Sequence, residues 1–207
     1  MKKELFWVSL FALFLAFAGN IFGQSIVGSA HDFSTASWNT TGQICIVCHA
    51  SHNADVSVND APLWNHQSTV ANFTPYSSAS LNATVGQPDA SSKLCLSCHD
   101  GTVAVDNFGG VTSGTFFITG SNLIGTNLND DHPVSFIYDP ALATVDGGLA
   151  DPTTTNSGLG GTISQDLLIG NKVQCASCHD VHNASGLDNL LIKSNAQSDL
   201  CLTCHIK

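Results

Sequence analysis

The most apolar stretch of the chain runs from Leu5 to Ala18 and follows two lysines. A short basic segment, an apolar segment of this length and then small residues predict a secretory signal peptide, here residues 1–24, with cleavage between Ala18 and Ser25. The apolar run is too short to cross a bilayer, and no later apolar segment reaches that length. We therefore expect a secreted protein without a membrane span.

The remaining chain, residues 25–207, shows little sustained hydrophobic periodicity. Much of it is Ser, Thr, Asn, Gly and Asp, which predicts a mostly irregular, loop-rich fold with short α-helices and little β structure. Thr115–Thr119 and Val134–Tyr138 are short apolar or β-branched runs bounded by Gly, Asp and Pro, and they predict strands. Ser92 and Ser198 stand where an N-cap would begin a short helix.

Four copies of the pattern Cys-x-x-Cys-His occur in this remainder and use all eight cysteines of the chain. This pattern is the attachment site of a c-type haem: two thiolates bind the haem vinyl groups, and the following His ligates the iron. A disulfide framework or a zinc site would not require a His directly after each cysteine pair. The predicted thioether residues are Cys45, Cys48, Cys95, Cys98, Cys175, Cys178, Cys201 and Cys204, and the predicted proximal iron ligands are His49, His99, His179 and His205.

The four motifs are arranged as two doublets with the same internal pattern. In each doublet C-x-x-C-H-x-x-H-N-A comes first and L-C-L-x-C-H second. We expect one domain, with the first doublet in residues 25–107, a haem-free middle in 108–170 and the second doublet in 171–207. So little chain serves four covalently bound haem c groups that stacked haems should form the core, and the chain without haem should be largely unfolded. For the haem-free middle the sequence leaves two alternatives, a small sheet or a packing surface for a partner.

Each haem iron needs a second axial ligand. The only Met is Met1, in the predicted signal peptide, so methionine ligation is excluded. His52 and His182 each follow a motif His by three residues, a spacing that places both imidazoles on one helical face. Axial ligands of one iron occupy opposite haem faces, so each of these two must bind a neighbouring haem. The distal candidates are the five remaining histidines, His31, His52, His66, His132 and His182.

A comparison of the two halves divides these candidates. His31 and His132 stand upstream of their doublets in similar settings, His-Asp-Phe-Ser and Asp-His-Pro-Val-Ser-Phe. Together with His52 and His182 they form a symmetric set of four donors. His66 has no counterpart in the second half. It is either a spare residue or a ligand that releases one of the others to bind a haem in another subunit.

The charge composition excludes several classes of partner. Without residues 1–24 the chain has four Lys, no Arg and fifteen Asp, a formal net charge of about −11. Such a chain has no basic stripe. We therefore expect neither nucleic acid nor an anionic lipid surface as a partner.

The doublet pattern resembles the doubled CxxCH family of multihaem c-type cytochromes. The four motifs, the predicted export, the loop-rich composition and the early His-Asp-Phe-Ser further resemble tetrahaem outer-surface cytochromes of metal-reducing bacteria that polymerise into conductive filaments, or nanowires. This resemblance implies bis-histidine ligation, haems in alternating parallel and T-shaped pairs, and one iron ligand donated by the next subunit. Transferred to this chain, it favours His52 as the intersubunit ligand, with His31 second.

The residues and the resemblance together give the expected function. We expect an electron-transfer protein, not an enzyme, that forms a homopolymer filament and exchanges electrons with other redox cytochromes or extracellular acceptors. The alternative is a discrete periplasmic or outer-surface tetrahaem carrier or docking subunit. A multihaem oxidoreductase is less favoured because it needs an exchangeable axial position, whereas five donors are present for four irons.

Overall fold

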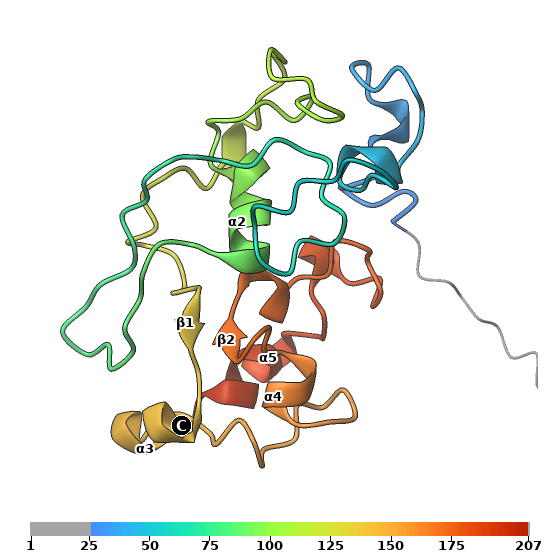
Figure 1. Ribbon diagram of the computed structural model, residues 1–207. Helices are drawn as coiled ribbons and strands as arrows, with labels where there is room; N and C mark the ends of the chain where they lie inside the picture. Colours follow the sequence, from blue (N-terminus) through green and yellow to red (C-terminus); the bar gives the residue numbers. More distant parts are fainter. Residues whose placement is uncertain (1–25, 207) are drawn as a thin grey trace, which may run out of the picture.

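The computed structural model describes residues 26–206, so the predicted signal peptide lies outside the described residues. Most of the described chain is irregular (Figure 1). This confirms the expected loop-rich fold class with short helices and little β structure. The α-helices are α2 (Ala90–His99), α3 (Pro140–Asp146), α4 (Ile163–Asp166) and α5 (Asp199–Cys204), and the strands are β1 (Phe136–Ile137) and β2 (Lys172–Val173). Short 3-10 helices cover Phe33–Thr35, Cys45–Val47, Gly120–Asn122, Cys175–Ser177, Asp188–Leu190 and Ala196–Ser198.

The two strands form one small antiparallel sheet in the described chain. Phe136 pairs with Val173 and Ile137 with Lys172. The strand expected at Val134–Tyr138 therefore exists in part, as β1. The strand expected at Thr115–Thr119 is wrong, because the backbone N–H groups of Thr115 and Phe116 donate to the carboxylate of Asp106 instead of to a strand.

A hydrophobic core joins the haem-free middle to the second doublet. Helix α3 of the middle is held at both ends: the Asp139 side chain accepts a hydrogen bond from Leu142 N at 2.8 Å, and Gly147 ends the helix with a φ of 71°. Helix α4 begins at Ile163, which is fully buried. Of the two alternatives for this segment, the small sheet is present. Its core consists of Phe136, Tyr138, Ala143, Ile163, Leu167 and Val173.

The predicted helix caps differ from the observed ones. Helix α2 starts earlier than expected, with Asp89 at the N-cap position, so the prediction that Ser92 caps the helix is wrong. Ser92 is instead buried inside α2, where its Oγ accepts a hydrogen bond from Cys175 N at 2.9 Å. Ser198 does stand at the N-cap position of α5, but it has a φ of 66° and makes no capping hydrogen bond through its side chain.

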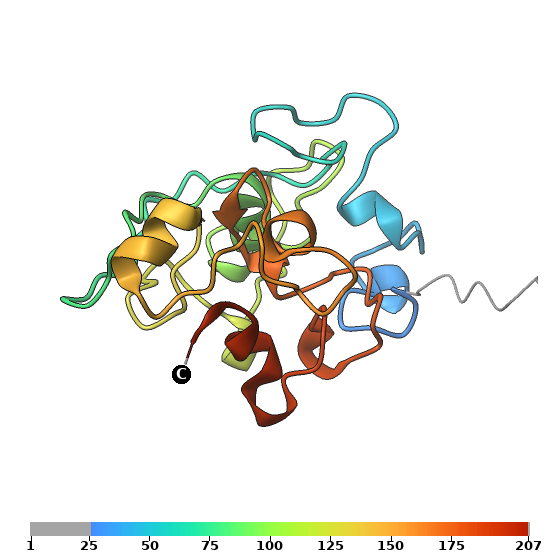
Figure 2. The same ribbon diagram turned by 90° about the horizontal axis from the view of Figure 1, so that it is seen from below.

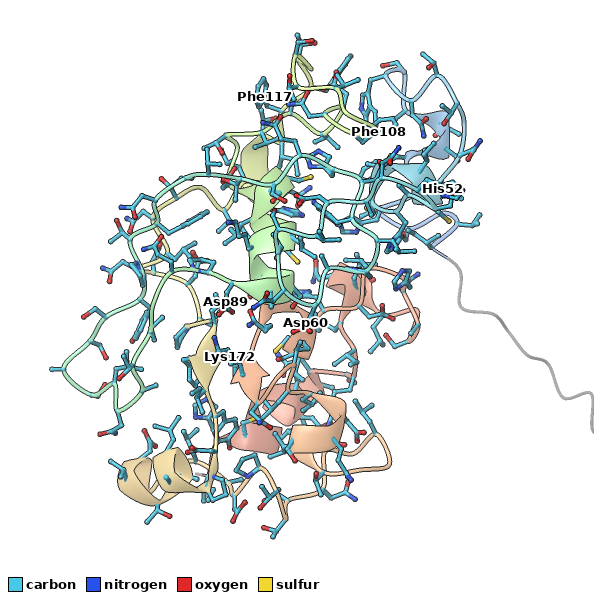
Figure 3. The ribbon with its side chains drawn as sticks, viewed as in Figure 1. His52, Asp60, Asp89, Phe108, Phe117 and Lys172 are labelled. Carbon is cyan, nitrogen blue, oxygen red and sulfur yellow. The ribbon has the colours of Figure 1, made fainter. Side chains whose placement is uncertain are left out.

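Helix α2 lies at the centre of the molecule and joins the two doublets. In Figure 1 the 3-10 helix at Cys175–Ser177 and strand β2 lie directly below α2, and Figure 2 shows the same segments together from below. Asp89 anchors this junction: it pairs with Lys172, as Figure 3 shows, and accepts a hydrogen bond from Gln174 Nε2 at 2.8 Å. Among residues 26–206, none of the helices has the length and apolar character that crossing a membrane requires.

Candidate haem-binding sites

The first motif of each doublet has the same local structure. Cys45–Val47 and Cys175–Ser177 form single 3-10 turns, and the motif His that follows donates its backbone N–H to the first cysteine's carbonyl. Residues three apart eclipse one another in a 3-10 turn, so both cysteines of a motif lie on one side. Two thiols on one side, followed directly by an imidazole, is the arrangement that haem attachment requires.

Each of these turns is held by an extended segment further along the chain. His49 forms a β-bridge with Trp64, and His179 forms the equivalent bridge with Leu191. In both halves the second cysteine's carbonyl accepts a hydrogen bond at 2.9 Å from the residue after the bridge, Asn65 or Ile192. The two halves therefore repeat in three dimensions as well as in sequence.

The second motif of each doublet lies on an α-helix. Cys95, Cys98 and His99 end α2, while Cys201 and Cys204 lie on α5 with His205 as its C-cap residue. Positions three apart are neighbours on a helix surface, so each cysteine pair again shares one face. The sequence therefore predicted the helical setting of these motifs correctly, although not the capping residue of α2.

The orientation of the motif histidines fits an iron ligand. The Nδ1 atoms of His49, His99 and His179 lie 2.5, 2.8 and 2.9 Å from the backbone carbonyl oxygens of Pro62, Asn122 and Asn189. A carbonyl oxygen can only accept, so Nδ1 carries the proton and Nε2 keeps its lone pair. This is the second-shell arrangement that fixes the tautomer of metal-binding histidines. No residue pattern predicts these three partners, because any residue type supplies a backbone carbonyl.

Three of the motif histidines face a second histidine. The ring centroids of His49 and His182 are 6.1 Å apart with nearly parallel planes, at 11°. Those of His31 and His99 are 6.1 Å apart at 62°. Those of His132 and His205 are 6.3 Å apart at 78°. Each pair combines one motif His with one of the five candidate distal histidines.

A comparison with known protein families bears on the second doublet. Residues 169–207 match the doubled CXXCH motif family. The second doublet therefore carries the motif by which multihaem c-type cytochromes attach haem. The match supports covalent haem c attachment through Cys-x-x-Cys-His, and the eight cysteines in four such pairs are consistent with four haem sites. No curated protein matches this chain.

The four motifs and this match indicate a multihaem c-type cytochrome, which implies electron transfer. The residues of this cytochrome would hold each haem by two thioether bonds and a motif imidazole. The carbonyls of Pro62, Asn122 and Asn189 fix three of these imidazoles in the required tautomer. Rigid ligands suit electron transfer because the iron then changes oxidation state without a change of ligand.

Thiols of the two doublets meet beside α2. Cys95 and Cys175 are hydrogen-bonded to each other, and this contact together with burial raises the pKa of Cys95. Burial raises the pKa of Cys98 to about 12 and that of Cys48 to about 11. The second site of the first doublet and the first site of the second doublet are therefore adjacent in this cytochrome.

His31 is the most shielded of the histidines that face a motif His. Burial, and then the nearby rings of His99, His179 and His182, lower its pKa to about 4. Its Nδ1 is buried without a hydrogen-bond partner among the described residues, a costly state for a ring nitrogen that binds nothing else. A neutral imidazole with an available nitrogen is suited to iron.

His66 occupies a different environment from the other four candidates. Its side chain is buried and faces no other histidine among the described residues. Its Nδ1 lies 2.9 Å from Gln67 O and its Nε2 lies 3.0 Å from Ala104 O, so each ring nitrogen has a backbone carbonyl oxygen beside it, and the nitrogen that carries the proton donates to one of them. It also touches Cys98 Sγ, 3.6 Å from Nε2. These contacts suit a packing residue beside the second haem site.

His52 and His179 have no facing imidazole within residues 26–206. Both side chains are exposed, and Figure 3 shows His52 at the outer edge of the first doublet. The local fold around His52 repeats that around His182: the next residue, Asn53 or Asn183, has a φ of 57° in both halves. The two histidines are therefore structurally equivalent, but only His182 faces a motif His.

Proposed function

We propose that this cytochrome is a subunit of an extracellular filament that conducts electrons through four bis-histidine c-type haems. Neighbouring haems in one chain, and then in successive copies, would pass electrons towards other redox cytochromes or extracellular acceptors. The proposal has two parts. Electron transfer by a multihaem cytochrome is supported by the motifs and the family match. The filament rests on the positions of His52 and His179.

The single observation that supports the filament is that one candidate distal histidine and one motif histidine each lack a facing imidazole among the described residues. His52 is exposed and faces no other imidazole within residues 26–206. His179 is exposed as well, with Nδ1 held by Asn189 O, and among residues 26–206 it makes no ring contact with another imidazole, although His31 lies near it. In contrast, His31, the other candidate for an intersubunit ligand, faces His99 within its own chain. This supports His52 of one copy as the ligand that completes the His179 iron of the next.

Such a contact would produce an open polymer. The donor and the acceptor are different residues, so each copy would offer one donor and one acceptor to its neighbours, and such a contact extends into an open polymer when it does not close into a ring. Each added copy would bring its first haem site next to the second doublet of its neighbour. In this arrangement every iron has two imidazoles and no exchangeable position, so the proposed function includes no catalysis.

A discrete carrier is the second candidate function, and the equivalence of the two halves favours it. His182 of the second half faces His49 of the first half. A reciprocal contact would place His52 opposite His179 of the same chain and close all four sites within one molecule. The filament and the discrete carrier therefore use the same two histidines and differ in whether the contact joins two molecules.

Replacement of His52 by alanine separates these functions. For the filament we expect fibres of the wild-type holoprotein by negative-stain electron microscopy, and only monomers of H52A with all four haems retained by mass. A Ser51→Ala variant, changed at the neighbouring exposed position, should form fibres as the wild type does.

Normal fibres from H52A would contradict the intersubunit ligand. Monomers from both wild type and H52A, with one iron converted to high spin in H52A, would instead support the discrete carrier and remove the filament.

A further inference from the structure

We infer that three distal iron ligands can be assigned: His182 to the His49 iron, His31 to the His99 iron, and His132 to the His205 iron. The inference rests on the bis-histidine haems of the proposed function and holds for a filament and for a discrete carrier alike. It names which residue completes which site and predicts that one haem ties the two halves of the chain together.

The spacing of the three imidazole pairs is the first argument. A metal–imidazole bond is about 2 Å long and the ring nitrogen lies about 1 Å from its centroid, so two imidazoles on one metal have centroids about 6 Å apart. The observed centroid distances are 6.1, 6.1 and 6.3 Å. All three pairs therefore leave room for one metal ion between their rings.

The composition of the pairs is the second argument, because aromatic rings that merely pack also reach such distances. The three pairs use six different histidines, and each contains one motif His and one non-motif His. Neither two motif histidines nor two candidate donors face each other in the described chain. Two other histidine contacts have similar spacing, His31 with Phe33 at 5.9 Å and His66 with Trp64 at 6.0 Å, but in each the partner ring is one that does not bind a metal.

The available nitrogens are the third argument. His49 and His99 hold Nδ1 against backbone carbonyl oxygens, and His132 does the same with Pro133 O at 2.9 Å. Each of these rings keeps Nε2 for a metal. His182 is steered by its own loop: Asp180 accepts a hydrogen bond from His182 N at 2.9 Å and lies 3.5 Å from the imidazole Nδ1.

The three assignments differ in what they join. His31 and His99 both belong to the first half. His132 lies in the haem-free middle and His205 in the second doublet, which follows it in the chain. His49 and His182 come from opposite halves, so the haem bound to Cys45 and Cys48 would be held by the second doublet through His182. Loss of His182 should therefore weaken the contact between the halves, which loss of His31 or His132 leaves intact.

The assignment is tested by combining a ligand variant with removal of the haem it is assigned to. In the wild-type holoprotein, His182→Ala should convert one of four irons from low to high spin, measured by electron paramagnetic resonance, with four haems retained by mass. In a Cys45→Ala/Cys48→Ala background, which carries three haems, the same His182→Ala change should leave all remaining irons low spin.

A new high-spin iron from His182→Ala in the three-haem background would overturn the assignment, because His182 would then bind another haem. Should that background fail to fold, the same comparison is made with His132→Ala in a Cys201→Ala/Cys204→Ala background at the end of the chain. His66→Gln serves as the control and should leave every iron low spin. If the wild type itself lacks low-spin haems, the proposed function fails. If only the background comparison fails, the proposed function stands and this pairing falls.

Discussion

The chain produced without haem attachment should be largely unfolded, with most of the far-UV circular dichroism and the cooperative thermal transition of the holoprotein lost. Three separate clusters of buried apolar side chains occur in the described residues, and two of these contain only three buried residues each. Clusters of this size cannot offset the conformational entropy of so much irregular chain. When cofactor binding supplies the core, the free energy of binding becomes free energy of folding.

Hydrogen exchange should locate any structure that the chain retains without haem. We expect residual protection in 136–173, where the cluster around Ile163 packs against the sheet, and none in the rest of the two doublets. An Ile163→Ala variant should abolish that residual protection, while Val145→Ala, at an exposed position of α3, should not. A haem-free chain with the cooperative transition of the holoprotein would show that the polypeptide forms its own core.

Removal of the third haem site should damage the molecule much more than removal of the fourth. In Cys175→Ala/Cys178→Ala the lost haem lies at the junction, where Cys175 N bonds to Ser92 and Gln174 bonds to Asp89. We expect an unfolding midpoint roughly 10 °C below that of Cys201→Ala/Cys204→Ala, the equivalent of a few kcal/mol at this chain length. Both variants should carry three haems by mass. The measurement is thermal unfolding followed by circular dichroism.

The fourth site is a matched control because its motif lies on the short helix α5 near the end of the chain, with Cys201 exposed. Its loss should leave the junction at α2 unchanged. Equal midpoints for the two double variants would mean that the contact between α2 and Cys175–Ser177 does not stabilise the molecule.

The sequence predicted the features that depend on local spacing. Two doublets with one repeated pattern were visible from the cysteines alone, and their turns and bridges repeat in the structure. The sequence also excluded His182 as a second ligand of the His179 iron, since three residues separate them. It could not choose the partner of His182, because the approach of His49 is set by tertiary packing between the halves.

Features that depend on contacts between distant residues could not be predicted from local sequence patterns. The core of the middle segment draws on residues as distant as Phe136 and Val173, which no periodic run connects. The strand expected at Thr115–Thr119 failed because one carboxylate, Asp106, competes for its backbone donors. The extra histidine, His66, looked like a ligand by residue type, and only its two carbonyl contacts show a different environment.

The central claim is that every haem iron is held by imidazole on both sides. Electron paramagnetic resonance of the oxidised full-length holoprotein, together with carbon monoxide binding by the reduced form, tests it most directly. We predict that all four irons are low spin and that carbon monoxide leaves the spectrum of the reduced protein unchanged. A high-spin iron in the resting protein, or carbon monoxide bound by the reduced one, would contradict the claim.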